Sequence, residues 1–78
     1  MKIDIRLIGR LEEYREIDDP LELSEGISVT EALVAIGIPA DELGMVSVNG
    51  ESIPKQNRST TILSDGDQIT AMALIKGG

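Results

Sequence analysis

The stretch Ser-Val-Thr-Glu-Ala-Leu-Val-Ala-Ile-Gly-Ile-Pro, residues 28–39, predicts a helix whose two ends are both specified by the sequence. Ser28 and Glu31 form the pattern of a capping box, in which each side chain accepts a hydrogen bond from the other residue's backbone N–H. Gly37 stands where a left-handed residue closes a helix, and Pro39 prevents continuation. Apolar residues between these signals follow the spacing of one helical face: Val29, Ala32, Leu33 and Ile36. We expect a helix of about nine residues whose apolar stripe must pack on another element.

Two strands are expected before this helix, at residues 2–8 and 21–24. Polar and apolar side chains alternate in the first segment, and the apolar ones share one face: Ile3, Ile5 and Leu7. The second segment alternates in the same way, so we expect the two strands to pair as a hairpin. Residues 11–19 between them are charged and irregular, which indicates a solvated loop.

Three strands are expected after the helix, at residues 45–48, 51–54 and 68–75. Asn49-Gly50 is the strongest short hairpin signal and joins the first two of these strands. Pro54 confines the second of them to a sheet edge. Residues 55–61 read as a polar loop, and Ser64-Asp65-Gly66-Asp67 reads as a tight turn before the last strand.

The element order, two strands, one main helix and three strands, predicts an α+β fold with one mixed sheet of about five strands. The first and last strands are the most continuously apolar, so we expect them side by side and parallel at the sheet centre. A mixed sheet that grips a single helix is the β-grasp arrangement. We expect residues 1–75 to form one domain and residues 76–78 to form a flexible tail.

Composition excludes several classes of site. The chain has 78 residues with no cysteine and no histidine, so disulfides and thiolate metal sites are excluded and the commonest general base is missing. One tyrosine is the only aromatic residue, so the core must be aliphatic. We expect no metal site, no signal peptide and no membrane span, and therefore a cytoplasmic protein.

The net charge of −7 argues against binding to nucleic acid, which needs clustered lysine and arginine. Seven acidic residues fall between Glu12 and Glu25, where nothing fixes the spacing of metal ligands. The charge indicates either solubility alone or steering toward basic surfaces of partner proteins.

The tail Lys76-Gly77-Gly78 directly follows the last expected strand. Two glycines make a thin, flexible tip that can thread a narrow channel and present its carboxyl group there. Lys76 either pairs with an acidic rim on a partner or keeps the tail solvated. A diglycine is also a common result of cloning or truncation, and chain ends tolerate change.

The last strand also suggests a docking surface beside the tail. If Ile69, Ala71 and Ala73 face the helix, the alternate residues face away from it: Thr70, Met72 and Leu74. Ser47 should lie on the same outer face of the neighbouring strand. Exposed Met72 and Leu74 would form a small apolar patch for a partner. The alternative is that a loop covers them, since both faces of this strand are largely apolar.

Taken together, the motifs resemble the ubiquitin-like sulfur carriers, of which the small subunit of molybdopterin synthase and the thiamine sulfur carrier are the best-known branches. The segments that carry the resemblance are Met1-Lys2-Ile3-Asp4-Ile5, Ser28-Val29, Gly37-Ile38-Pro39, Val48-Asn49-Gly50, Leu63-Ser64-Asp65-Gly66-Asp67 and Gly77-Gly78. Their order and spacing cover essentially the whole chain.

The resemblance implies a cycle centred on Gly78. An adenylating enzyme uses MgATP to activate the Gly78 carboxylate, and a persulfide donor such as a cysteine desulfurase supplies sulfur to form a thiocarboxylate. A recipient synthase, either the molybdopterin synthase large subunit or a thiazole synthase, then takes the sulfur. Gly77 and Lys76 would thread the tail into these partners. The chain binds no cofactor and has no catalytic residue of its own in this scheme, which agrees with its lack of cysteine and histidine.

Neither branch is favoured by every motif. The long acidic segment between the first two strands resembles the molybdopterin branch, whereas Ile53-Pro54-Lys55 resembles the thiamine branch. The Pro-Pro pair that the molybdopterin branch commonly has before its diglycine is absent here. Two other functions stay open: a ubiquitin-like modifier conjugated through Gly78, and a β-grasp interaction domain whose diglycine has no role.

Overall fold

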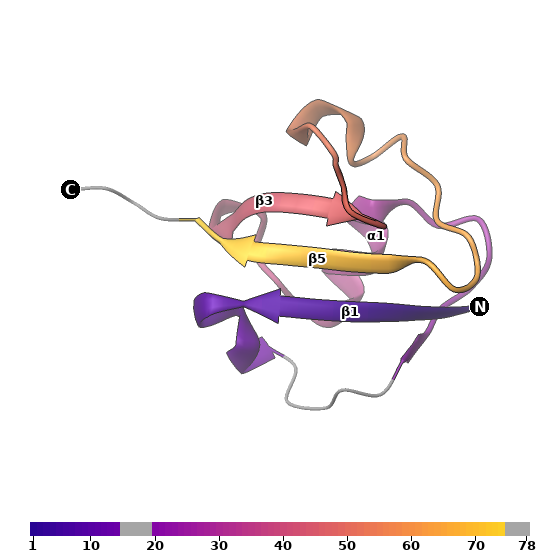
Figure 1. Ribbon diagram of the computed structural model, residues 1–78, viewed down its shortest axis with the longest axis horizontal. Helices are drawn as coiled ribbons and strands as arrows, with labels where there is room; N and C mark the ends of the chain where they lie inside the picture. The colour runs from indigo at the N-terminus through magenta and orange to yellow at the C-terminus, as the bar shows by residue number, and fades with distance from the viewer. Residues whose placement is uncertain (15–19, 75–78) are drawn as a thin grey trace.

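The computed structural model describes residues 1–14 and 20–74. Within these residues a five-stranded sheet packs against one α-helix, and the strand order is β2-β1-β5-β3-β4 (Figure 1). The strands are β1 (Lys2–Ile8), β2 (Leu21–Glu22), β3 (Leu43–Val48), β4 (Glu51–Ser52) and β5 (Gln68–Ala73). The helices are α1 (Val29–Ile36) and three short 3₁₀ helices, η1 (Gly9–Tyr14), η2 (Ala40–Glu42) and η3 (Lys55–Asn57).

The centre of the sheet is the parallel pair β1 and β5, in which Ile5 lies opposite Ile69 and Leu7 opposite Ala71. Figure 1 shows these two strands running in the same direction, with β3 antiparallel on the other side of β5. β1 pairs with β2 in the expected antiparallel hairpin. The predicted mixed sheet with parallel central strands is therefore confirmed, and the fold is a ubiquitin-like β-grasp.

The helix α1 has the ends that its sequence predicts. The Ser28 side chain accepts a hydrogen bond from the Glu31 N–H, and the Ser28 N–H donates to the Glu31 carboxylate, each at 3.1 Å. Gly37 has a φ of 93°, and its N–H donates to the carbonyl of Val34. The Ile38 N–H donates to the Leu33 carbonyl at 3.3 Å, which completes a Schellman motif.

The core between sheet and helix is aliphatic throughout. Its buried hydrophobic residues are Ile3, Leu11, Val29, Ala32, Leu33, Ile38, Val46, Leu63, Ile69 and Ala71. They come from β1, η1, α1, β3, β5 and the segments that connect them, so residues 1–14 and 20–74 share one core. Within the described ranges, no helix is long and apolar enough to cross a membrane.

The structure differs from the sequence-based expectation mainly between β1 and β2. The expected irregular loop begins as η1, and Leu11 inserts into the core with 1% of its surface exposed. Residues 15–19 of that predicted loop lie outside the described residues. Residues 9–14 form η1 instead of an irregular loop because the apolar side chain of Leu11 is buried in the core, and this burial stabilises a compact path for them.

Smaller differences concern element ends. β2 and β4 are two residues long, β3 begins at Leu43, and the predicted polar loop 55–61 contains η3. The last strand ends at Ala73, and residue 75, its predicted end, lies outside the described residues. The predicted turns are confirmed: Asn49 and Gly50 have φ values of 52° and 84°, as a type I′ turn requires, and Gly66 has 86°.

Candidate functional site

The predicted carrier residue Gly78 and the predicted threading residues Gly77 and Lys76 lie outside the described residues. The last described residues are Ala73, which ends β5, and Leu74. We call these two residues the tail root, because the tail continues from them. The site is therefore built from the contacts that hold the tail root and from the surfaces beside it.

The backbone of the tail root is held by η2 and the start of β3. The Leu74 N–H donates to the Glu42 carbonyl at 2.8 Å, and Ala73 lies opposite Leu43 in the ladder. Gly44 approaches so closely that a Cβ there would lie 3.0 Å from the Ala73 carbonyl oxygen. A side chain at Gly44 would therefore push the tail root away from β3.

The pairing of β3 with β5 is irregular at the same point. Leu43 lies opposite Ala73 but Val46 lies opposite Ala71, so β3 has one extra residue beside Met72. This is the count expected for a β-bulge, which bends a strand and redirects its side chains. The bulge places Gly44 against the tail root.

Two side chains from other segments reinforce this region. Arg58, which follows η3, donates from Nη2 to the Gly44 carbonyl at 2.7 Å. Burial lowers the pKa of the Arg58 guanidinium below its ordinary value. The hydroxyl of Tyr14 in η1 donates to the Glu42 carboxylate. That hydrogen bond, with desolvation and nearby carboxylates adding to it, raises the pKa of Tyr14 above 10.0.

Three of the four predicted docking residues, Ser47, Thr70 and Met72, lie on the outer sheet face, away from α1. Ile69 and Ala71 are fully buried, and Met72 has 38% of its surface exposed, as the predicted alternation requires. Thr70 is half-buried and lies directly opposite Ser47 on β3. The structure thus brings Ser47, Thr70 and Met72 onto one face of two neighbouring strands.

Two apolar residues of this face were not identified from the sequence. Ile8 lies opposite Met72 on the parallel strand β1 and is 39% exposed. Met45, next to the fully buried Val46, is 61% exposed. We call Ile8, Met45 and Met72 the outer apolar patch. Ile8 could have been found from the sequence, because it is out of phase with the inward-facing Ile3, Ile5 and Leu7. The exposure of Met45 results from the bulge in β3, which the sequence does not indicate.

Leu74 follows the end of β5, so strand alternation no longer fixes its direction. It is 38% exposed and borders a hollow on the other side of β3, together with Lys55 and Arg58. The predicted set of docking residues is therefore divided between two surfaces that meet at the tail root.

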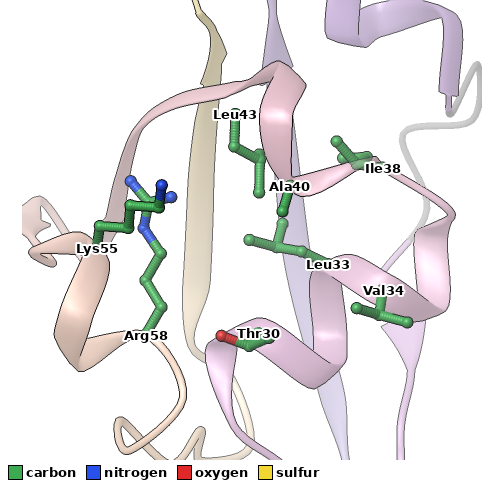
Figure 2. A pocket seen from close by; sticks show the side chains of 8 residues that line it. All are labelled: Thr30, Leu33, Val34, Ile38, Ala40, Leu43, Lys55 and Arg58. Atoms are coloured by element: carbon green, nitrogen blue, oxygen red, sulfur yellow. The ribbon is translucent and has the colours of Figure 1, made fainter.

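The hollow continues between α1, η2 and η3, where apolar side chains and the two cationic residues surround it (Figure 2). The described residues contain no group of three or more acidic, histidine or cysteine side chains placed to hold a metal ion. The one ion pair among them joins the Met1 ammonium to Glu22 at 3.8 Å. The described surface thus offers binding features rather than a paired acid and base.

Comparisons with known proteins agree with this fold. The ThiS family model matches residues 5–78. The thiamine biosynthesis protein (ThiS) of Geobacter metallireducens is 23% identical to this chain, with a TM-score of 0.72, and the match covers 100% of both chains. SAMP1 of Haloferax volcanii is 18% identical, with a TM-score of 0.71 and 100% of both chains covered. Urm1 of Trypanosoma brucei is 14% identical, with a TM-score of 0.60 over 99% of this chain and 95% of that one.

No curated protein sequence matches the chain significantly. The three structures are too distant in sequence to show more than a shared fold. The family match covers nearly the whole chain, and its fold is the one that the sheet order and the single helix define. The chain therefore belongs to the ThiS family of ubiquitin-like sulfur carriers.

Proposed function

We propose that this chain carries sulfur as a thiocarboxylate on Gly78 and donates it for the biosynthesis of a sulfur-containing cofactor. The observation that carries the proposal is the family match, which extends to residue 78 and so includes both glycines. The lack of cysteine and histidine also supports it, because the groups that activate the tail must then come from other proteins.

The chemistry follows from the weakness of a carboxylate as an electrophile. The Gly78 carboxylate attacks the α-phosphorus of MgATP on an adenylating enzyme, and pyrophosphate leaves. A persulfide sulfur then attacks the activated carbonyl carbon and displaces AMP. A thiol then attacks the sulfur of the acyl disulfide that came from the donor and forms a disulfide with it, and the thiocarboxylate is left on Gly78.

Adenylation requires that a partner hold both the tail and the body of the carrier. We propose that the adenylating enzyme covers the outer apolar patch together with Thr70 and Ser47, since an exposed apolar patch beside a reactive tail suits a transient interface. Lys76 and Gly77 then thread the tail into the enzyme, where a side chain at Gly77 would meet the walls around it.

The recipient is a thiazole synthase or the large subunit of a molybdopterin synthase. The family model that matches is that of ThiS, the name that the Geobacter thiamine biosynthesis protein also bears, and this family match favours the thiazole synthase. Incubating the thiocarboxylated carrier with each synthase and its substrate, and measuring which one consumes the sulfur, distinguishes the two recipients.

The first experiment is the intact mass of the protein purified from its native cytoplasm. We expect a fraction in which one sulfur replaces one oxygen, mapped by fragmentation to the C-terminal peptide. Oxidised methionine gives nearly the same mass change, and the exposed Met45 and Met72 are candidates for it, so the mapping is essential. Conjugates that survive thiol reductant would instead indicate a protein modifier. An unmodified terminus that is also inert to an adenylating enzyme with ATP would contradict the proposal.

The docking surface is tested separately with purified adenylating enzyme. Met72→Ser should raise the carrier concentration needed for half-maximal adenylation. Ile62→Ser is the matched control, because Ile62 is 55% exposed but lies neither on the outer apolar patch nor at the hollow. Equal effects of the two substitutions would exclude the patch as the docking surface.

A further inference from the structure

The hollow beside the tail root combines an apolar wall with two positive charges. Leu33, Val34, Ile38 and Leu43 line the part next to α1, which has a volume of about 160 Å³. Lys55 and Arg58 line this part and also a wider part of about 460 Å³ that reaches Gly44 and Leu74. Figure 2 shows the nitrogen atoms of Lys55 and Arg58 at one end and the aliphatic side chains toward the other. We call this surface the cationic hollow.

The two cations are placed together by the backbone of η3. The Arg58 N–H donates to the Lys55 carbonyl, so the two residues are three apart in a 3₁₀ turn. Side chains three apart in such a turn lie almost above one another. Residues 55 and 58 therefore face the same side.

The cationic hollow gathers positive charge on a chain that has a net negative charge. The protein has seven basic residues against 14 acidic ones, and two of the seven line one small hollow. Neither Lys55 nor Arg58 forms an ion pair with a described carboxylate, although Asp41 borders the wider part. Arg58 Nε is buried and has no hydrogen-bond partner among the described residues.

Arg58 can bind a carboxylate and still keep its hydrogen bond to the Gly44 carbonyl beside the tail root. Its guanidinium carries five N–H groups, and the bond to the Gly44 carbonyl occupies one N–H of Nη2. The two N–H groups of Nη1 and the second N–H of Nη2 remain for an anionic ligand, whereas the buried Nε does not face a partner, and Lys55 adds a point charge nearby.

We propose that the cationic hollow is a docking site for an acidic segment of a partner protein, which inserts one aliphatic side chain between α1 and β3 and places a carboxylate on Lys55 and Arg58. The apolar wall would contact the partner's aliphatic side chain, and the two cations would bind its carboxylate. A free inorganic anion would leave the apolar wall exposed. A second copy of this chain is disfavoured as the occupant, because each copy has a net charge of −7.

This site lies on the helix side of the sheet and is distinct from the outer apolar patch. The two surfaces meet at Leu74, so a partner that handles the tail can grip the carrier from both sides. The inference does not depend on the chemistry at Gly78, and its test measures binding alone.

The test is an amide NMR titration of the full chain with a short acetylated peptide in which one leucine is flanked by aspartate and glutamate residues. We expect salt-dependent shifts that cluster at Thr30, Val34, Lys55, Arg58 and Gly44. Two control peptides, one with the leucine replaced by serine and one with the acids replaced by lysine, should bind more weakly.

Substitutions then locate the site. Lys55→Glu should weaken binding of the acidic peptide by about fivefold or more, since one exposed charge interaction contributes up to about 1 kcal/mol and here its sign is reversed. Lys55 is exposed, so the fold should tolerate the change. Ile62→Ser should leave the affinity unchanged.

Four outcomes would overturn the proposal: no shifts at millimolar peptide, shifts centred on the outer apolar patch, equal binding of the leucine-free peptide, or the same pattern with inorganic phosphate alone. The last outcome would show a simple anion site rather than a protein-docking site.

Discussion

The two ends of β5 are held in different ways. At its beginning, short polar motifs make the contacts: Asp67 accepts hydrogen bonds from the Ser64 N–H and the Asn49 side chain, and Asn49 in turn accepts one from the Gln68 N–H. At its end, the tail root contacts η2 and β3, and distant residues hold those elements in place. The end that starts the strand is fixed by polar side chains of two turns, which also bond to each other, whereas the end that leads to the tail depends on close packing around Gly44.

This difference affects how each end responds to mutation. Losing a turn contact should lower the stability of the whole domain without changing the tail root specifically. Losing a packing contact at the tail root should change both the stability and the local protection of Leu74. The predictions below separate these two responses.

The largest effect is expected for Gly44→Ala. The new Cβ would lie 3.0 Å from the Ala73 carbonyl oxygen and 3.2 Å from Leu74 Cα, and backbone atoms cannot move aside as a flexible side chain can. Overpacking of this kind costs about 1–3 kcal/mol. Urea unfolding should show the loss, and hydrogen exchange of the Leu74 amide should accelerate beyond the change in global stability. Ser47→Ala on the same strand is the control, and an unchanged Leu74 amide in Gly44→Ala would disprove the close packing.

The sequence predicted the beginning of β5 but not its end, for a physical reason. The backbone turns at Asn49-Gly50 and Ser64–Asp67 are set by neighbours within a few residues, so residue type and spacing specify them, although the bond between Asn49 and Asp67 spans 18 positions. The Schellman motif at Gly37 and the capping box at Ser28 are local in the same sense. The parallel pair β1 and β5 is not local, but continuous apolar character identified it.

The tail root depends on tertiary contacts that no turn motif in the sequence indicates. Arg58 reaches Gly44, and Tyr14 reaches Glu42 across 28 positions. Nothing near Gly44 in the sequence indicates a bulge. The polar composition of residues 55–61 predicts a loop and so does not indicate the cationic hollow, whereas the observed 3₁₀ turn places Lys55 and Arg58 on one side.

A smaller effect is expected for Asp67→Ala. It removes an acceptor for the Asn49 side chain at 2.9 Å and for the Ser64 N–H at 2.8 Å, which should cost about 1–2 kcal/mol because hydrogen bonds to charged groups are the stronger ones. Urea unfolding should show this loss, while exchange of the Leu74 amide should change only as much as global stability does. A selective acceleration at Leu74 would mean that the two ends of β5 are coupled.

The coupling between Asn49 and Asp67 should be smaller still. A double-mutant cycle of Asn49→Gly and Asp67→Ala should give an interaction energy of about 0.5–1 kcal/mol, as expected for side chains in one hydrogen-bond network. Glycine keeps the positive φ of 52° accessible, so the cycle measures the side-chain contact. The control cycle pairs Asn49→Gly with Asp65→Ala. Asp65 accepts a hydrogen bond from the Lys2 N–H and not from Asn49, so the effects of these two substitutions should be additive. Additivity in both cycles would rule out the Asn49–Asp67 contact in solution.

The smallest effect concerns the one tyrosine of the chain, whose absorbance reports η1 without interference. Its hydrogen bond to Glu42 raises the pKa of Tyr14 above 10.0 in the folded protein, so folding favours the neutral phenol. The stabilisation from this contact is therefore complete below pH 10.0 and is lost as the pH rises through the raised folded-state pKa. Glu42→Gln should lower the measured pKa of Tyr14, and Tyr14→Phe should lose less stability than the parent above pH 10.0. A parent protein whose tyrosine titrates like a free one would show that η1 does not support η2, and the position of η2 beside the tail root would then not depend on Tyr14.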